Sequence, residues 1–139
     1  MLPRETLQAL GDAAGAGGLE EHAPVQVDGV AIGVTLRPAD GASLARTLEA
    51  LGRTGVSALV RGCGSHLGFG NPPRSADVFV CVERLAGVDE FDAADGVCHA
   101  AAGTTLAEVR ETVAAGGWEL PLDPPGERAS VGGTLAAAA

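Results

Sequence analysis

Apolar and polar residues change their spacing along the first half of the chain, and the change predicts a strand, a helix and a second strand. Residues 30–36 are mostly apolar and stop before a proline, as is typical of a strand. The next apolar residues recur at helical spacing: Leu44, Leu48 and Leu51. Residues 56–60 then form an apolar run that we expect to be a strand buried on both faces. This order, with short links, predicts a small βαβ unit with a parallel pair.

Shorter elements are expected on both sides of this unit. Residues 4–15 predict a short helix, whereas the acidic, proline-containing segment 20–27 is interpreted as a linker. Residues 77–82 predict a third strand. A hairpin is expected around Asp95-Gly96, because this dipeptide is typical of hairpin turns. The hairpin would open a second, antiparallel lobe.

The last third of the chain predicts one helix between less regular segments. Thr105 and Glu108 have the spacing of a capping box, and the helix that they begin should end at Gly116-Gly117. Residues 118–122 are interpreted as a short strand, and residues 130–134 as a second glycine loop. The fold class that follows is α+β, with a small βαβ parallel-sheet lobe followed by the start of an antiparallel sheet lobe.

A length of 139 residues fits one domain. We divide the chain into an N-terminal helix and linker, residues 1–22, and a domain over residues 23–139. The chain stops in alanines after Leu135, in a segment that looks like the beginning of an element. We therefore expect a domain that is incomplete at its C-terminus, and an isolated chain that is marginally stable and binds ligands weakly.

The composition excludes several classes of partner. Nine basic residues, all of them arginine, stand against 18 acidic ones and give a net charge of −9. Such a domain repels nucleic acid and has no basic face for a membrane surface. We find no signal peptide and no apolar run long enough to form a transmembrane segment. Three cysteines without C-x-x-C spacing favour the reducing cytoplasm, and no metal-ligand pattern is present.

The sharpest chemical feature is the glycine-rich loop over residues 62–73, which follows the predicted strand 56–60. Glycines let consecutive backbone N–H groups converge on one anion, and Arg61 at the mouth of the loop adds a positive charge. A pyrophosphate would suit this loop, whereas the alternative is a flexible connection. A P-loop is excluded because the chain has no lysine, and a Rossmann turn because prolines prevent a helix directly after the loop.

The stretch from Val60 to Gly70 resembles the pyrophosphate loop of the vanillyl-alcohol oxidase and p-cresol methylhydroxylase superfamily of FAD proteins. Three further segments resemble family motifs and follow in the family's order: Arg37-Pro38 with the helix after it, residues 102–106, and residues 120–125 with 129–136. Within the superfamily, Gly70-Asn71-Pro72-Pro73-Arg74 is most similar to the FAD-binding subunit of bacterial glycolate oxidase. The resemblance implies a PCMH-type FAD-binding domain, with FAD between two lobes.

The resemblance also implies roles for individual residues. The backbone amides of the first loop would wrap the FAD pyrophosphate, and this group consists of Arg61, Gly62, Cys63, Gly64, Ser65, His66 and Gly70. The region from Leu122 to Pro124 would lie near the flavin or its ribityl chain. The second glycine segment would hold the other side of the cofactor, through Ser130, Gly132, Gly133 and Thr134. No catalytic residue can be named.

The function implied is that of the FAD-binding part of a flavin-dependent oxidoreductase that oxidises a small 2-hydroxy acid. Two alternatives stay open: a non-catalytic FAD-binding or electron-transfer subunit, and a truncated remnant that binds no flavin. The expected partners are a small-molecule substrate and possible subunits of an oxidase complex.

Two loop residues have a reactive and an inert interpretation. Some relatives attach FAD covalently through a histidine, but their histidine aligns with Ser65, so we expect His66 to leave the flavin unattached. Cys63 stands where many relatives have glycine, and it would be strained if this position needs a positive φ. Its thiol is either activated by Arg61 and the loop amides or simply fills space in the loop.

Overall fold

The computed structural model describes residues 2–124 and 128–137. The helices are α1 (Arg4–Ala14), α2 (Gly41–Thr54), α3 (Leu106–Ala115) and α4 (Val131–Ala137). The strands are β1 (Leu19–Val27), β2 (Val30–Leu36), β3 (Ala58–Arg61), β4 (Val78–Cys81), β5 (Val88–Asp92) and β6 (Val97–Ala100). Among these residues, no helix has both the length and the apolar character needed to cross a bilayer.

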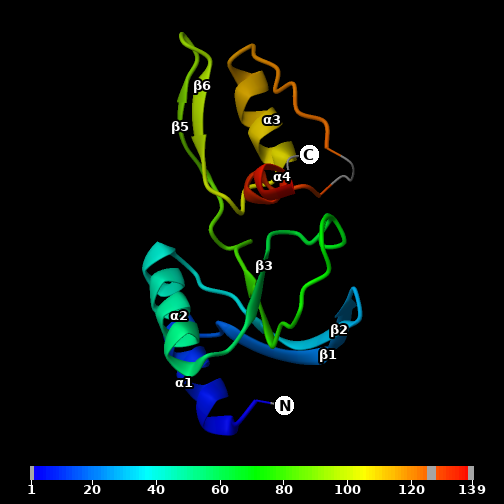
Figure 1. Cartoon of the computed structure of the whole chain (residues 1–139). Coiled ribbons are helices and arrows are strands. Elements are labelled where there is room, and N and C mark those ends of the chain that lie inside the picture. Colours follow the sequence, from blue (N-terminus) through cyan, green and yellow to red (C-terminus); the bar gives the residue numbers. More distant parts are fainter. Residues whose placement is uncertain (1, 125–127, 138–139) are drawn as a thin grey trace.

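The first lobe is a sheet of four strands in the order β1-β2-β4-β3 (Figure 1). Strand β4 pairs in parallel with both β2 and β3, whereas β1 is antiparallel to β2. The predicted unit of β2, α2 and β3 is therefore present, with β4 inserted between its two strands. The second lobe contains the antiparallel pair β5-β6, so the expected α+β fold class is confirmed.

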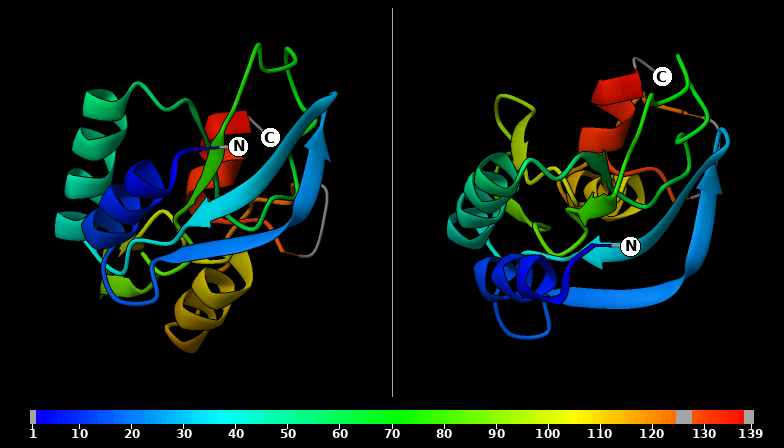
Figure 2. Two further views of the ribbon diagram at one scale, coloured as in Figure 1. Left: turned by 90° about the horizontal axis from the view of Figure 1, so that it is seen from below. Right: turned by 60° about the horizontal axis from the view of Figure 1, so that its bottom comes forward.

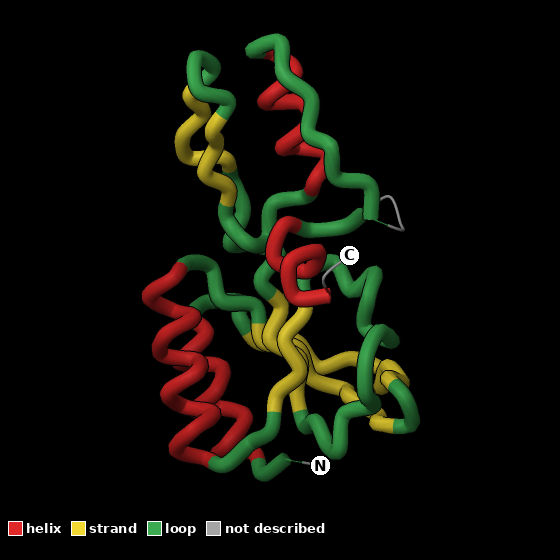
Figure 3. Tube along the Cα trace, turned by 45° about the horizontal axis from the view of Figure 1, so that its top comes forward, coloured by secondary structure: helices red, strands yellow, loops and turns green. Residues whose placement is uncertain are grey.

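Helices α1 and α2 lie side by side against one face of the sheet (Figures 2 and 3). The core beneath them consists of Leu10, Ala14, Leu36, Ala50, Leu51, Val78 and Val80. Helix α2 is capped at its start by Asp40, whose carboxylate accepts from the Ser43 amide at 2.7 Å, and at its end by Gly55, which has φ 67°. Its predicted apolar stripe is only partly buried, because Leu48 is 49% exposed.

The opposite face of the sheet has a smaller apolar cluster of Val27, Ile32, Ala76 and Phe79. Leu67 of the glycine loop packs against this cluster. The loop therefore folds back over the sheet and is anchored by burial of an apolar side chain rather than projecting freely into solvent.

The interpretation of residues 20–27 as a linker is wrong, because Leu19–Val27 forms β1. This strand and β2 are joined by Asp28 and Gly29, which have φ values of 47° and 88°. Two successive positive φ values characterise the type I′ hairpin turn, for which Asp-Gly is a favoured pair. The acidic residues are mostly exposed because β1 is an edge strand.

The strand predicted at 56–60 forms as β3, but the expectation that it is buried on both faces is wrong. Val60 is 58% exposed, because β3 lies at the edge of the sheet. The fully buried strand is β4, which has a neighbour on each side. Apolar character alone does not distinguish an edge strand from a central one.

The second lobe contains the β5-β6 hairpin, α3 beside it, and α4 at the base of α3 (Figure 1). The capping box at Thr105 and Glu108 is confirmed. Residues 118–122, predicted as a short strand, have no strand pairing. Instead, the Trp118 indole N–H donates to the Ala93 carbonyl at 2.8 Å, so this segment is held by a side chain.

Candidate functional site

The glycine loop leaves the sheet at the end of β3, and its first peptide is fixed by the neighbouring strand. The amide of Val82 donates to the carbonyl of Arg61 at 2.9 Å. Gly64 has φ 79° and Gly70 has φ 93°, a region that other residues rarely adopt. Among the described residues, Asp28 is the one non-glycine residue with a positive φ, so Cys63 does not carry the strain that the sequence suggested.

The second glycine segment is not a loop, because Val131–Ala137 is the helix α4. Its glycines permit close packing instead. A Cβ on Gly62 would overlap the Ser130 hydroxyl, and a Cβ on Gly132 would lie 2.9 Å from that of Ala102. The Ser130 hydroxyl also accepts from the Gly133 amide at 3.2 Å. The Gly62–Ser130 contact brings the residue that precedes α4 against the start of the glycine loop, and α4 lies between the two lobes (Figure 3).

A cavity of about 210 Å³ lies between the glycine loop and α4. It collects most of the residues predicted for the pyrophosphate and for the second side of the cofactor: Arg61, Gly62, Cys63, Gly64, Ser65, His66, Ser130 and Gly133. The two glycine segments, about 65 residues apart in the sequence, thus share one cavity. A volume this small suits part of a dinucleotide cofactor rather than the whole molecule.

The remaining predicted residues lie elsewhere. Gly70 is exposed farther along the loop, Gly132 packs on Ala102, and Pro124 is buried. Leu122 and Thr134 line a second cavity, of about 510 Å³, with largely apolar walls. The structure therefore separates a cavity at the glycine loop, with a mixed polar and apolar lining, from a largely apolar one beneath α3 and α4.

Sequence reasoning missed the apolar walls of the first cavity. They are formed by Leu59, Val60, Leu67, Phe69, Ala136 and Ala137. The ring of Phe69 lies edge-on to that of His66, with centroids 4.8 Å apart. The apolar residues Leu67 and Phe69 inside the glycine loop could have indicated an apolar cavity wall from the sequence alone. Ala136 and Ala137 could be assigned to the cavity only once α4 was known to be a helix.

Three buried side-chain polar atoms among the described residues have no hydrogen-bond partner: Arg61 Nε, His66 Nε2 and Thr134 Oγ1. Two of them belong to residues that line the first cavity. The Arg61 guanidinium also lies 4.5 Å from the centroid of the Phe79 ring. An unsatisfied buried polar group costs about 1–3 kcal/mol, and both nitrogens belong to side chains of the type that donates hydrogen bonds to phosphate oxygens. The residues present therefore fit a pyrophosphate.

Cys63 is the one thiol that lines this cavity, within the described part of the chain. Burial, followed by the negative charge of Glu83, raises the pKa of the Cys63 thiol. A raised pKa favours the thiol over the thiolate at neutral pH, and thus favours the interpretation of Cys63 as a space-filling residue.

We expect iodoacetamide to alkylate Cys63 more slowly than free cysteine at pH 7.5, because only the thiolate reacts. Peptide mass mapping would follow this site, and the rate should rise as the pH increases beyond the ordinary thiol range. Urea should raise the rate to that of free cysteine, since unfolding removes both the burial of the thiol and the nearby charge of Glu83. Labelling of Cys63 in the native protein faster than free cysteine would contradict this prediction.

The parallel sheet, the antiparallel sheet and their order along the chain define a two-lobed fold of the PCMH type. Residues 32–139 match the family described as FAD binding domain, and the chain belongs to this family. FAD is accordingly its cofactor, and the resemblance to the vanillyl-alcohol oxidase and p-cresol methylhydroxylase superfamily is confirmed at this level. No curated protein is detectably similar to the chain in sequence.

Solved structures share the fold at low identity. Alkyldihydroxyacetonephosphate synthase superimposes with a TM-score of 0.78 and 17% identity, over 98% of this chain and 29% of the other. Substrate-bound p-cresol methylhydroxylase gives a TM-score of 0.66 and 10% identity, over 81% of this chain and 24% of the other. Wild-type Phl p 4.0202, a glucose dehydrogenase, superimposes with a TM-score of 0.63 and 14% identity, over 81% of this chain and 26% of the other. The chain thus spans less than a third of the length of these proteins.

Proposed function

We propose that this chain is the FAD-binding part of a flavin-dependent oxidoreductase, and that the reaction oxidises a small 2-hydroxy acid. One observation carries the cofactor site: the cavity between the glycine loop and α4, with buried, unpartnered nitrogens on Arg61 and His66. The family match to an FAD binding domain supports the same conclusion.

In this proposal the residues of the chain bind and orient the cofactor. FAD, when bound, supplies a two-electron acceptor. The backbone N–H groups around Gly64 and the Arg61 guanidinium would hold the pyrophosphate, and Ser130, just before α4, would support the loop. Leu67 and Phe69 form apolar walls that would exclude water from these contacts.

The substrate class rests on the resemblance of Gly70-Asn71-Pro72-Pro73-Arg74 to the FAD-binding subunit of glycolate oxidase. This segment forms the end of the glycine loop and carries Arg74, a cation suited to a carboxylate. Two alternatives lead to different experimental results: a non-catalytic FAD-binding or electron-transfer subunit, and a remnant that binds no flavin.

The test is an FAD titration of the purified protein, followed by anaerobic mixing of the complex with glycolate or lactate. Binding should quench flavin fluorescence, and oxidation of the acid should bleach the flavin absorbance band. A 3-hydroxy acid of equal size is the substrate control and should not bleach it. Binding without bleaching would favour the non-catalytic subunit, and absence of binding would favour the remnant.

We expect the bound FAD to be non-covalent, because Ser65 occupies the position of the attaching histidine in covalent relatives. In the structure the Ser65 hydroxyl lies 3.0 Å from His66 Nδ1, which leaves His66 Nε2 as the one ring nitrogen without a partner. Acid precipitation of the loaded protein should release all flavin into the supernatant. Fluorescence that migrates with the denatured chain, and is lost in His66→Ala, would show that His66 attaches the cofactor.

A further inference from the structure

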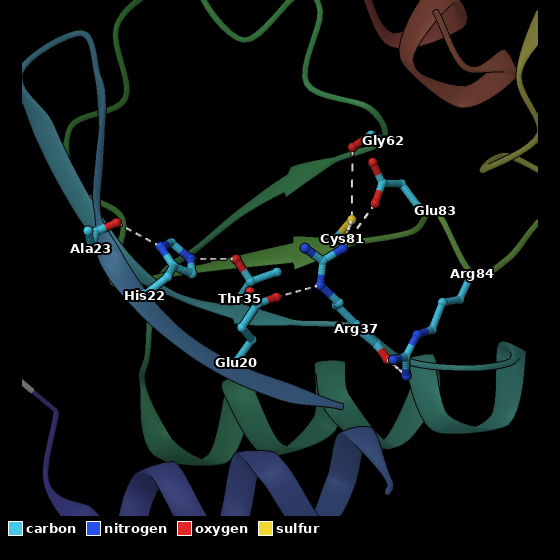
Figure 4. A network of polar contacts seen from close by, with 9 residues as sticks. All are labelled: Glu20, His22, Ala23, Thr35, Arg37, Gly62, Cys81, Glu83 and Arg84. Atoms are coloured by element: carbon cyan, nitrogen blue, oxygen red, sulfur yellow. Dashed lines mark hydrogen bonds and ion pairs between the residues drawn. The ribbon is translucent and has the colours of Figure 1, made fainter. Parts of the chain in front are cut away.

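A chain of polar contacts connects the outer strands of the sheet to the first residue of the glycine loop (Figure 4). Arg37 follows β2 and donates from Nε to Glu20 and from Nη1 to Glu83, each at 2.9 Å. The same Nη1 lies 3.4 Å from the sulfur of Cys81. That sulfur in turn lies 3.9 Å from the carbonyl oxygen of Gly62. The Glu83 carboxylate therefore lies beside the start of the glycine loop.

The charges in this region are unfavourable for an anionic cofactor unless they are paired. The chain has a net charge of −9 and contains no lysine, so every cation near the loop is an arginine. Glu20 and Glu83 are the carboxylates of the network. Arg37 bridges the two, and Arg84 donates to the backbone carbonyl of Arg37 at 3.2 Å. Removing Arg37 would leave the Glu83 carboxylate without its ion pair, close to a site for a diphosphate.

The influence of Glu83 extends as far as the cavity. Its negative charge is one of the causes that raise the pKa of Cys63, second to burial, and Cys63 lines the cavity. The Glu83 side chain is 35% exposed, so solvent screens this charge only in part. An unpaired carboxylate here would repel an anionic ligand bound to the loop.

We propose that Arg37 neutralises Glu83 and thereby allows this acidic domain to bind the FAD diphosphate. Arg37 has no contact with the cavity, so it acts through Glu83 as a positioning residue. The inference rests on FAD binding at the glycine loop. A purely structural role of Arg37 would make a different prediction. If Arg37 acts by neutralising Glu83, the loss of FAD affinity in an Arg37 variant is restored when the charge of Glu83 is also removed.

The test is FAD affinity by fluorescence titration of the purified protein and its variants. Arg37→Gln should weaken FAD binding by roughly five- to tenfold at low salt, and the deficit should shrink in high salt as the repulsion is screened. Arg37→Lys should stay within about twofold of the original protein, because it keeps the charge. The double variant Arg37→Gln/Glu83→Gln should also recover to within about twofold, because no unpaired carboxylate remains at position 83. Arg53→Gln is the control and should have no effect, since Arg53 pairs with Glu49 on the exposed face of α2.

The outcomes separate the inference from the cofactor site itself. If the original protein does not bind FAD, the proposed function fails. If it binds FAD but Arg37→Gln binds equally well, or the double variant is as weak as the single one, the role of Arg37 is only structural. If circular dichroism shows that Arg37→Gln is unfolded, the FAD affinity of the single variant Glu83→Gln tests the proposal instead. It should bind FAD about twofold or more tightly, and unchanged or weaker binding would overturn the proposal.

Discussion

Replacing Gly64 by valine is expected to weaken FAD binding by at least about tenfold while leaving the fold of both lobes intact. Gly64 has φ 79°, and a β-branched residue adopts this conformation only with strain of about 1–3 kcal/mol or more. The loop would relieve the strain by changing its backbone, which turns the N–H groups away from the pyrophosphate. Flavin content after purification and a fluorescence titration measure the effect.

The matched control lies in the same loop. Gly68 is exposed, its φ lies outside the left-handed region, and a Cβ there would meet no atom within 4 Å. Gly68→Val should therefore keep its flavin. Equal affinity of both variants, together with native circular dichroism, would show that the geometry at Gly64 does not matter for the cofactor.

A second large effect is expected at the junction of the lobes. Gly103 is buried, and its amide donates to the Leu85 carbonyl at 2.9 Å. A Cβ on Gly103 would overlap the carbonyl of Val82 and lie 2.8 Å from that of Leu85. Backbone atoms cannot move aside as a flexible side chain can. Gly103→Ala should therefore lower the free energy of unfolding by about 1–3 kcal/mol, measured by urea denaturation.

Gly52→Ala is the control for this change. Gly52 lies inside helix α2, and a Cβ there would meet no atom within 4 Å. The substitution should stabilise the protein by about 0.5–1 kcal/mol, because alanine favours a helix interior. If both variants were equally stable, close approach of the lobes at Gly103 would not be a source of strain.

Elements with a strong local signal were predictable from the sequence. The capping boxes at Asp40 and Thr105 each satisfy helix N–H groups within four residues, so the starts of α2 and α3 needed no tertiary information. The hairpin at Asp95-Gly96 was similarly evident. The Asp28-Gly29 turn carried the same signal, and its position between apolar residues could have identified β1 and β2 as a hairpin.

The part of the candidate site on the first loop was also accessible to sequence reasoning. A glycine-rich segment after an apolar strand, without a lysine and without a following helix, indicated an anion-binding loop of a particular superfamily. The contribution of Arg37 was not accessible, because its partners Glu20 and Glu83 lie 17 and 46 residues away. Only strand pairing brings these three residues together.

The sequence by itself determined the glycine-rich character of the loop after β3, the capped starts of α2 and α3, and the family. These properties depend on backbone conformations that glycine, proline and capping side chains impose locally. The tertiary structure decided that β4 rather than β3 is the buried strand, and that the second glycine segment is a helix whose glycines allow close packing. It also decided which residues share the cavity. Burial and contact depend on what packs against a residue, and that is fixed by strand order and by the approach of the two lobes rather than by the residue's neighbours in the sequence.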